Sequence, residues 1–340
     1  MTKKNVLLDK LIKATTLEDV AILSEQDIHR HDPISTPVPM INVALSANPA
    51  GGVQPGSLMI AGDSKHFKTG FGLLLVSAFL ARYEDAVVLF YDSEFGHNDS
   101  YFDLFGIEKS RIIHCPITTV EEWRTDIKNQ LNTIERGDHV MILVDSIGML
   151  ASAKEVADAE AGNEKADMTR ARTLNSAFRI IGPHLTLKGI PMVVINHTYK
   201  EIGTMYPQEI ISGGKKAYLN ANDIWIIGRS KDMDDKELVG YNFTIRVEKS
   251  RTVKEGSRIP ITISFEKGIN KYSGLFEFAL EQGIIDSPSK GRYRYTGNCS
   301  EIVAKDKTFT RSAMDVPEFW DVLLKDPEFL TQIKDRYALA

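Results

Sequence analysis

Residues 57–76 read SLMIAGDSKHFKTGFGLLLV, and this stretch decides the fold. Residues 57–61 are apolar and predict a short buried strand, residues 62–69 predict a tight turn, and residues 70–76 predict an apolar helix. A strand, a glycine-led turn and a Lys-Thr pair that opens a helix are the parts of a phosphate-binding loop. Backbone N–H groups in such a loop, together with the helix N-terminus, attract a polyphosphate.

The candidate nucleotide-binding residues of this loop are Gly62, Asp63, Ser64, Lys65, His66, Phe67, Lys68, Thr69 and Gly70. Lys68 would reach the β- and γ-phosphates, which makes it a candidate catalytic residue, and Thr69 would offer its hydroxyl to Mg²⁺. Phe67 stands where the consensus has a second glycine, so we expect the loop to use backbone angles that a side chain allows. An ordinary strand–turn–helix with a chance Lys-Thr pair is the alternative.

Length and composition favour a globular protein. The chain has 340 residues, of which 43% are hydrophobic and 26% charged, enough for one large domain with smaller appendages. Cys115 and Cys299 lie far apart and match no metal-ligand spacing, which indicates a reducing compartment. No apolar run approaches a membrane span, so we expect a cytoplasmic protein with no membrane partner. Because the net charge is −5, a nucleic-acid partner would need basic groups gathered on one surface or along an assembly.

The chain begins with a candidate helical unit, residues 1–30. Apolar stripes at helical spacing in residues 7–12 and 17–23 predict two short helices, and Thr16 with Asp19 predicts a capping box for the second. The pattern leaves open whether this unit packs on its own domain or on a neighbouring subunit.

From residue 31 to residue 270 the chain alternates strand and helix. Apolar runs at residues 86–91, 139–144 and 191–195 predict strands, with further strand-like runs at residues 224–228, 241–249 and 260–265. Capped or periodic segments at residues 119–136 and 167–187 predict helices, the second bent or ended by Pro183. This alternation predicts an α/β fold with a mostly parallel sheet covered on both faces.

Ligands bind such sheets beyond the carboxyl ends of the strands, where this chain carries several polar groups. Asp145 would hold the Mg²⁺ shell, and Glu94 would orient the attacking water or take its proton, although Asp92 competes for that role. Asn196 and His197 would hydrogen-bond the γ-phosphate region and report its presence to the following segment. Each residue alone has a structural alternative: a turn cap for Asp145, a surface carboxylate for Glu94 and a structural histidine for His197.

The order of these motifs resembles the RecA-type DNA strand-exchange recombinases, most of all the UvsX recombinases of T-even-like phages. The resemblance covers roughly residues 34–285 and rests on Gly51-Gly52, the phosphate loop, Tyr91-Asp92-Ser93-Glu94, Val144-Asp145-Ser146, Asn196-His197 and Gly213-Gly214. It implies a RecA-like P-loop ATPase core at residues 31–270, with ATP and Mg²⁺ as cofactors. The UvsX phosphate loop also carries Phe-Lys before the hydroxyl residue.

The resemblance also assigns roles to single residues. Glu94 matches the catalytic glutamate, and His197, a third candidate catalytic residue, stands where bacterial RecA proteins have glutamine. Tyr101 matches a tyrosine that stacks on adenine. Lys249 and Arg251 match two basic residues that reach the ATP of the adjacent subunit. Core packing for Tyr101 and solvent-facing charge for the two cations are the structural alternatives.

Two segments, residues 151–167 and 198–214, are expected to be long loops, and the resemblance implies that they bind DNA. In the family such loops hold single-stranded DNA along a filament axis. The candidate DNA-binding residues are Arg170, Arg172, Lys200, Met205, Tyr206, Gly213 and Gly214. Backbone contacts without base readout would make binding sequence-tolerant and salt-sensitive. Glu155, Asp158, Glu160 and Glu164 in the first loop argue against a simple phosphate cradle, and a surface excursion is the alternative for both loops.

Residues 271–340 predict a small α+β lobe. A helix is expected at residues 275–282, a basic and aromatic hairpin at residues 290–295 (KGRYRY), and a helix at residues 316–337 that is broken around Pro327. The hairpin would guide duplex DNA or be a solvated surface feature.

The sequence therefore predicts an ATP-dependent homologous recombinase. It would form helical filaments on single-stranded DNA, with ATP between subunits, and pair them with double-stranded DNA in the cytoplasm of a phage-infected bacterium. A recombination mediator and a single-strand-binding protein are expected partners. Two alternatives remain open from the sequence: a hexameric replicative helicase, and a nucleotide-sensing assembly protein without DNA contact.

Overall fold

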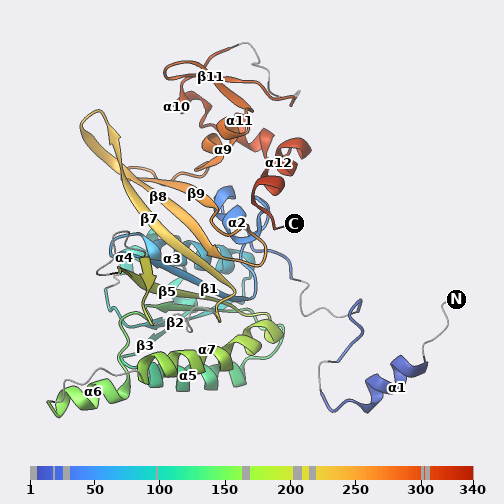
Figure 1. The fold of residues 1–340 in the computed structure, drawn as a ribbon, viewed down its shortest axis with the longest axis vertical. Helices are drawn as coiled ribbons and strands as arrows, with labels where there is room; N and C mark the ends of the chain where they lie inside the picture. The colour runs from blue at the N-terminus through green and yellow to red at the C-terminus, as the bar shows by residue number, and fades with distance from the viewer. Residues whose placement is uncertain are drawn as a thin grey trace.

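The computed structural model describes residues 6–17, 20–25, 31–96, 99–162, 169–201, 209–213, 220–299, 302 and 307–339. A ten-stranded sheet runs through its middle in the order β10-β9-β8-β7-β1-β5-β4-β2-β3, with β6 paired to β5 (Figure 1). The strands are β1 (Gly56–Gly62), β2 (Val87–Asp92), β3 (Ile112–Pro116), β4 (Val140–Asp145), β5 (Pro191–Lys200), β6 (Glu209–Ile211), β7 (Asp223–Asp234), β8 (Glu237–Lys249), β9 (Arg258–Ser264) and β10 (Gly268–Ile269).

The predicted α/β class with a mostly parallel sheet is confirmed. Every neighbouring pair from β7 across to β3 is parallel. Strands β8, β9 and β10 then extend the sheet in antiparallel fashion. Strands β7 and β8 form a long hairpin whose turn projects from the body of the molecule (Figure 1). This hairpin borders the phosphate loop, because β7 is the direct neighbour of β1.

Helices cover both faces of the sheet, α2 (Pro39–Ser46) and α3 (Lys68–Arg82) on one face, and α5 (Val120–Thr133) and α7 (Thr169–Lys188) on the other (Figure 1). Strand β1 shows how they share the core. Leu58 and Ile60 join the hydrophobic cluster that includes α2 and α3, while Met59 and Ala61 join the cluster that includes α5 and α7. Because both faces are buried, these strands read as continuous apolar runs rather than alternating ones.

The two long helices of the second face were predicted well. Helix α5 begins with the expected capping box between Thr119 and Glu122, and α7 buries the expected apolar face of Leu174, Phe178, Ile181 and Leu185. Of the two expected effects of Pro183, a bend or an end, the end is excluded, because α7 continues to Lys188, close to the predicted limit at residue 187. The first candidate DNA loop also contains structure that the sequence did not predict, a short helix α6 (Ala153–Glu160) capped by Ser152. The remaining short elements are α4 (Asp99–Leu104) and a 3₁₀ turn η1 (Lys109–Arg111).

The described residues of the N-terminal unit, 6–17 and 20–25, form one helix, α1 (Val6–Ala14), which lies apart from the sheet (Figure 1). None of its residues is buried, and Leu7 and Leu11 are each more than 60% exposed. The predicted second helix is not formed at Leu17 or at residues 20–25, so that prediction is wrong for the described residues, and Asp19 lies outside them.

The C-terminal lobe consists of α9 (Leu275–Glu281), β11 (Ile285–Ser289), β12 (Arg292–Tyr295), α10 (Arg311–Met314), α11 (Pro317–Leu323) and α12 (Pro327–Tyr337). The helix break before Pro327 is as predicted. The hairpin is longer than predicted, because KGRYRY supplies only its turn and second strand while residues 285–289 form the first. Tyr295 and Trp320 belong to the same hydrophobic cluster as α2 and α3. The domain limits 1–30, 31–270 and 271–340 stay a prediction. Among the described helices, none is long and apolar enough to span a membrane.

Candidate nucleotide site

The phosphate loop joins the end of β1 to the start of α3, and its backbone is unusual at two residues. Lys65 (φ 63°) and Phe67 (φ 58°, ψ 23°) both adopt the left-handed conformation. A side chain tolerates that conformation at a cost of roughly 1–2 kcal/mol. Phe67 therefore adopts the left-handed backbone conformation that glycine would favour at this position of the loop.

Aromatic packing offsets the strain at Phe67. Its ring lies 5.5 Å from the ring of Phe71, 5.7 Å from that of Phe243 and 6.3 Å from that of Phe105, measured between centroids. The ring also fills the space beside Gly70, where a Cβ atom would come within 2.4 Å of two ring carbons. Phe67 and Gly70 thus depend on each other, and the second glycine of the consensus is replaced by an anchored aromatic residue.

Lys68 is the buried cation of the loop. Its side chain is enclosed, and Nζ donates to the backbone carbonyl of Asp63 at 2.8 Å. Burial lowers the pKa of Lys68 below that of an ordinary lysine, although the carboxylates of Glu94 and Asp145 oppose this effect. An ammonium group that donates to a backbone carbonyl of the loop can exchange that bond for phosphate oxygens.

Thr69 and Asp145 offer oxygen ligands of the kind that Mg²⁺ prefers. Thr69 Oγ1 donates to Asp145 Oδ2 at 2.6 Å, which joins the start of α3 to the end of β4. Among the described residues, no group of three or more His, Cys, Asp or Glu side chains could hold a metal ion. The pair therefore fits a Mg²⁺ ion whose shell is completed by water and substrate phosphates, rather than one held by protein alone.

Glu94 and His197 meet above the sheet. Glu94 Oε1 lies 2.9 Å from His197 Nε2, which in turn lies 3.3 Å from Ser146 Oγ. The hydrogen bond from His197 holds the pKa of Glu94 below its usual range, so Glu94 is a carboxylate at neutral pH. The sequence pattern did not predict the contact of Ser146 with His197, although the position of Ser146 directly after Asp145 places it at the same strand end. Lys68, Thr69, Glu94, Tyr101, Asp145 and His197 line one cavity.

Asp92, the competitor of Glu94, has a different place. It is buried, and its Oδ1 accepts hydrogen bonds from the backbone N–H groups of Glu94 and Phe95. Its Oδ2 lies 3.0 Å from His114 Nε2. Asp92 therefore shapes the turn that carries Glu94, and it does not line the cavity around Lys68. This arrangement favours Glu94 as the residue that faces a nucleotide.

Asn196 points away from that cavity, so the expected contact of Asn196 with the γ-phosphate does not fit. Its Nδ2 donates to the carbonyl of Ser212 at 2.9 Å, and its Oδ1 accepts the backbone N–H of His197 at 2.8 Å. The backbone N–H of Ser212 donates to the carbonyl of His197. These bonds tie the end of β5 to the residue before Gly213, which begins the Gly-Gly pair of the second candidate DNA loop.

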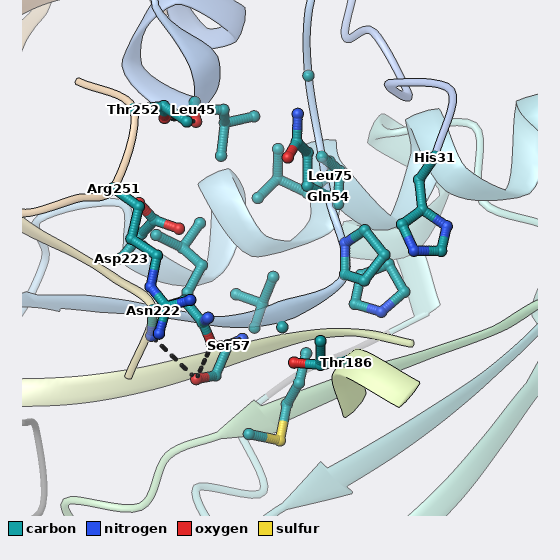
Figure 2. Close-up of a pocket in the computed structure, with 18 residues that line it drawn as sticks. His31, Leu45, Gln54, Ser57, Leu75, Thr186, Asn222, Asp223, Arg251 and Thr252 are labelled. Atoms are coloured by element: carbon teal, nitrogen blue, oxygen red, sulfur yellow. Dashed lines mark hydrogen bonds between the residues drawn. The ribbon is translucent and has the colours of Figure 1, made fainter. Parts of the chain in front are cut away.

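Lys249 and Arg251 lie at the opposite edge of the sheet from the phosphate loop. Lys249 pairs with Ile224 near the start of β7, and its Nζ donates to the carbonyl of Ala221 at 2.6 Å. Figure 2 shows Arg251 in a pocket beside Ser57 and Asn222, at the amino ends of the strands. The length of β1, about 20 Å, separates this edge from the loop, so neither cation reaches the phosphate loop of its own molecule.

Comparisons with known proteins agree with this geometry. The family model "RecA N-terminal domain" matches residues 5–270. The model "Bacteriophage T4, Recombination and repair protein, C-terminal domain" matches residues 272–333. The chain belongs to the RecA family.

Individual relatives give the same result for this RecA-family protein. The "Recombination and repair protein" of Enterobacteria phage T4 is 41% identical over 337 residues, covering 98% of this chain and 86% of that protein. "Protein RecA" of Cytophaga hutchinsonii is 25% identical over 284 residues, covering 82% of this chain and 77% of that protein. As a member of this family, the chain is a recombination and repair recombinase and a DNA-dependent ATPase. The helicase and the DNA-independent sensor are no longer needed as alternatives.

The candidate DNA-binding residues of this recombinase fall into four groups. Arg170 does not fit a phosphate contact, because its guanidinium donates to the carbonyls of Ile147, Gly148 and Leu150 and so holds the segment after β4. Arg172 and Lys200 are exposed, the first on α7 and the second at the end of β5. Gly213 is left-handed (φ +96°), as a hinge glycine would be. Met205, Tyr206 and Gly214 lie outside the described residues.

Proposed function

We propose that this recombinase binds ATP and Mg²⁺ at the carboxyl edge of its sheet, where a neighbouring subunit of a helical filament closes the site. The observation that carries the proposal is the split arrangement of the candidate groups. Lys68, Thr69, Glu94 and Asp145 come together at one edge, whereas Lys249 and Arg251 lie at the other. Head-to-tail stacking would bring the second group of one subunit to the nucleotide of the next.

In this proposal, each side chain has a definite task. Lys68 releases the Asp63 carbonyl and binds the β- and γ-phosphates. Thr69 and Asp145 hold Mg²⁺, which neutralises phosphate charge when bound. Glu94 orients the attacking water rather than taking its proton, because a carboxylate with a lowered pKa is a weak base at pH 7. Tyr101, half-buried beside the same cavity, stacks on the adenine.

The path from nucleotide to DNA is proposed to run through β5. A γ-phosphate competes with Glu94 for His197, which is covalently next to Asn196 and hydrogen-bonded through its backbone to Ser212. A shift of this strand end therefore moves the loop that begins at Gly213. ATP would favour the state that grips DNA, and hydrolysis would release it.

DNA binding is proposed to be weak per subunit and strong along the filament. Arg172 and Lys200 are exposed cations near the two candidate loops, and Met205 and Tyr206 would wedge between bases. Repeating these contacts along one axis lets a chain of net charge −5 hold single-stranded DNA. The filament would then pair with double-stranded DNA and exchange strands in the host bacterial cytoplasm, assisted by mediator and single-strand-binding proteins.

The test combines nucleotide binding, turnover and imaging. Lys68→Ala should abolish ATP binding and DNA binding together, while Glu94→Gln should keep filaments and stop phosphate release. Lys231→Ala removes an exposed lysine on β7 and is the matched control for lost charge. Electron microscopy with ATP and single-stranded DNA should show open helical filaments. Closed rings, or ATP affinity retained by Lys68→Ala, would refute the proposal.

A further inference from the structure

The phosphate loop is held from outside by the β7–β8 hairpin. Arg229, on β7, donates from Nη1 to the carbonyl of Lys65 at 2.9 Å. His66 Nδ1 lies 2.6 Å from the carbonyl of Ile227, also on β7. The ring of Phe67 packs against Phe243 on β8. Three consecutive loop residues thus contact one neighbouring hairpin.

Arg229 itself is fixed on that hairpin. Its guanidinium lies 4.7 Å above the centre of the Tyr241 ring. Such a cation–π contact holds the planar group while one of its N–H groups points at the loop. Arginine suits this task better than lysine, because its donors lie in a rigid plane that stacks on an aromatic ring.

The loop needs such support because of its composition. Residues 63–69 contain no glycine, yet Lys65 and Phe67 are both left-handed. Left-handed non-glycine residues persist when the surrounding structure holds them. The Phe67 ring provides that support for one of them, and the bond to Arg229 is positioned to provide it for the other.

We propose that Arg229 is a positioning residue for nucleotide binding, which keeps the peptide of Lys65 in its left-handed conformation without touching the nucleotide. This inference rests on the proposed nucleotide site. It predicts that ATP affinity depends on a hairpin whose turn projects from the protein, while the chemical step does not. Loss of Arg229 should weaken binding of ATP, because the loop must then be reordered before each binding event.

The first experiment measures the equilibrium Kd of a fluorescent ATP analogue together with the kcat and KM of DNA-stimulated hydrolysis. For Arg229→Gln we expect Kd and KM to rise roughly fivefold to tenfold, the range for one hydrogen bond and one exposed cation–π contact, with kcat within about twofold of the unaltered protein. Arg229→Lys should show a similar loss. The matched control, Lys231→Gln, removes an exposed cation two residues farther along β7 and should leave all three constants unchanged.

A rescue experiment separates this role from a direct contact. Glycine adopts the left-handed conformation at little cost, so Lys65→Gly should make Arg229 dispensable. Adding Arg229→Gln to Lys65→Gly should raise Kd less than about twofold. An equal loss in both backgrounds, or an unchanged Kd in Arg229→Gln alone, would overturn the inference. A smaller salt dependence of DNA binding in Arg229→Gln, with unchanged Kd for ATP, would instead make Arg229 a DNA contact.

The same set of variants distinguishes failure of this inference from failure of the proposed function. If Lys68→Ala keeps its ATP affinity, the nucleotide site itself is wrong. If Lys68→Ala loses ATP while Arg229→Gln binds it normally, the site stands and only the support by Arg229 is refuted.

Discussion

The dependence between Phe67 and Gly70 can be tested with a double-mutant cycle. In Gly70→Ala, the new Cβ would lie 2.4 Å from two carbons of the Phe67 ring and 2.7 Å from a third. The ring cannot retreat, because Phe71, Phe105 and Phe243 surround it. We expect this overpacking to destabilise the protein by about 2 kcal/mol, reduced to about 1.5 kcal/mol by the better helix propensity of alanine.

Phe67→Gly should have a similar net effect for a different reason. Loss of a half-buried ring costs about 2–3 kcal/mol, and relief of the left-handed backbone returns about 1 kcal/mol. Without the ring, a Cβ atom added at position 70 would no longer clash with it. The double variant Phe67→Gly/Gly70→Ala keeps only the gain in helix propensity and should be about 0.5 kcal/mol more stable than Phe67→Gly. That is about 2 kcal/mol more stable than additivity predicts.

The assay is urea unfolding followed by circular dichroism, with ATP affinity measured in parallel. Gly182→Ala is the matched control, because Gly182 also lies in a helix and its Cβ would meet nothing within 4 Å. Because Gly182 precedes Pro183, contact between the new Cβ and the proline ring opposes the gain in helix propensity, and we expect that variant to stay within about 1 kcal/mol of the unaltered protein. If Gly70→Ala destabilises the protein equally with and without the Phe67 ring, the coupling is absent and our account of the loop fails.

Three further predictions concern the site and the N-terminal unit. Burial lowers the pKa of Lys68 and a bound phosphate needs the charged form of the side chain, so ATP affinity should fall with rising pH, and at a lower pH than an ordinary lysine would titrate. A fall only where an ordinary lysine titrates would contradict this. Asn196→Ala removes the hydrogen bond to the Ser212 carbonyl and should reduce the stimulation of ATP hydrolysis by DNA several-fold while basal hydrolysis persists. The assay is phosphate release with and without single-stranded DNA, and equal losses of both rates would point to a purely structural role. Removal of residues 1–30 should leave the thermal unfolding midpoint nearly unchanged, because α1 buries no residue. The truncation should nevertheless prevent filament growth, and normal filaments from the truncated chain would show that the unit is not an intersubunit contact.

Much of the nucleotide site could be predicted because its residues lie in short motifs of consecutive residues. The phosphate loop, the capping box at Thr119 and the apolar strands that end at Asp145 and before Glu94 each occupy a few consecutive residues. Parallel strands place their carboxyl ends at one edge, so their convergence followed from the pattern alone. The same local reasoning failed for the second N-terminal helix, since Leu17 and residues 20–25 are not helical although their apolar residues have helical spacing.

Contacts between distant segments were decided only by the tertiary structure. The sequence shows no sign that Arg170 bonds to the carbonyls after β4, or that Asn196 bonds to Ser212 rather than facing the nucleotide. The sequence shows that Phe67 departs from the consensus, but it does not show that the ring of Phe243, 176 positions away, packs against it. Arg229 meets Lys65 because β7 pairs with β1, and that pairing depends on how the whole sheet is ordered. A stretch of sequence determines which shapes its own backbone favours, but the side chains that hold a strained shape come from wherever the fold brings them.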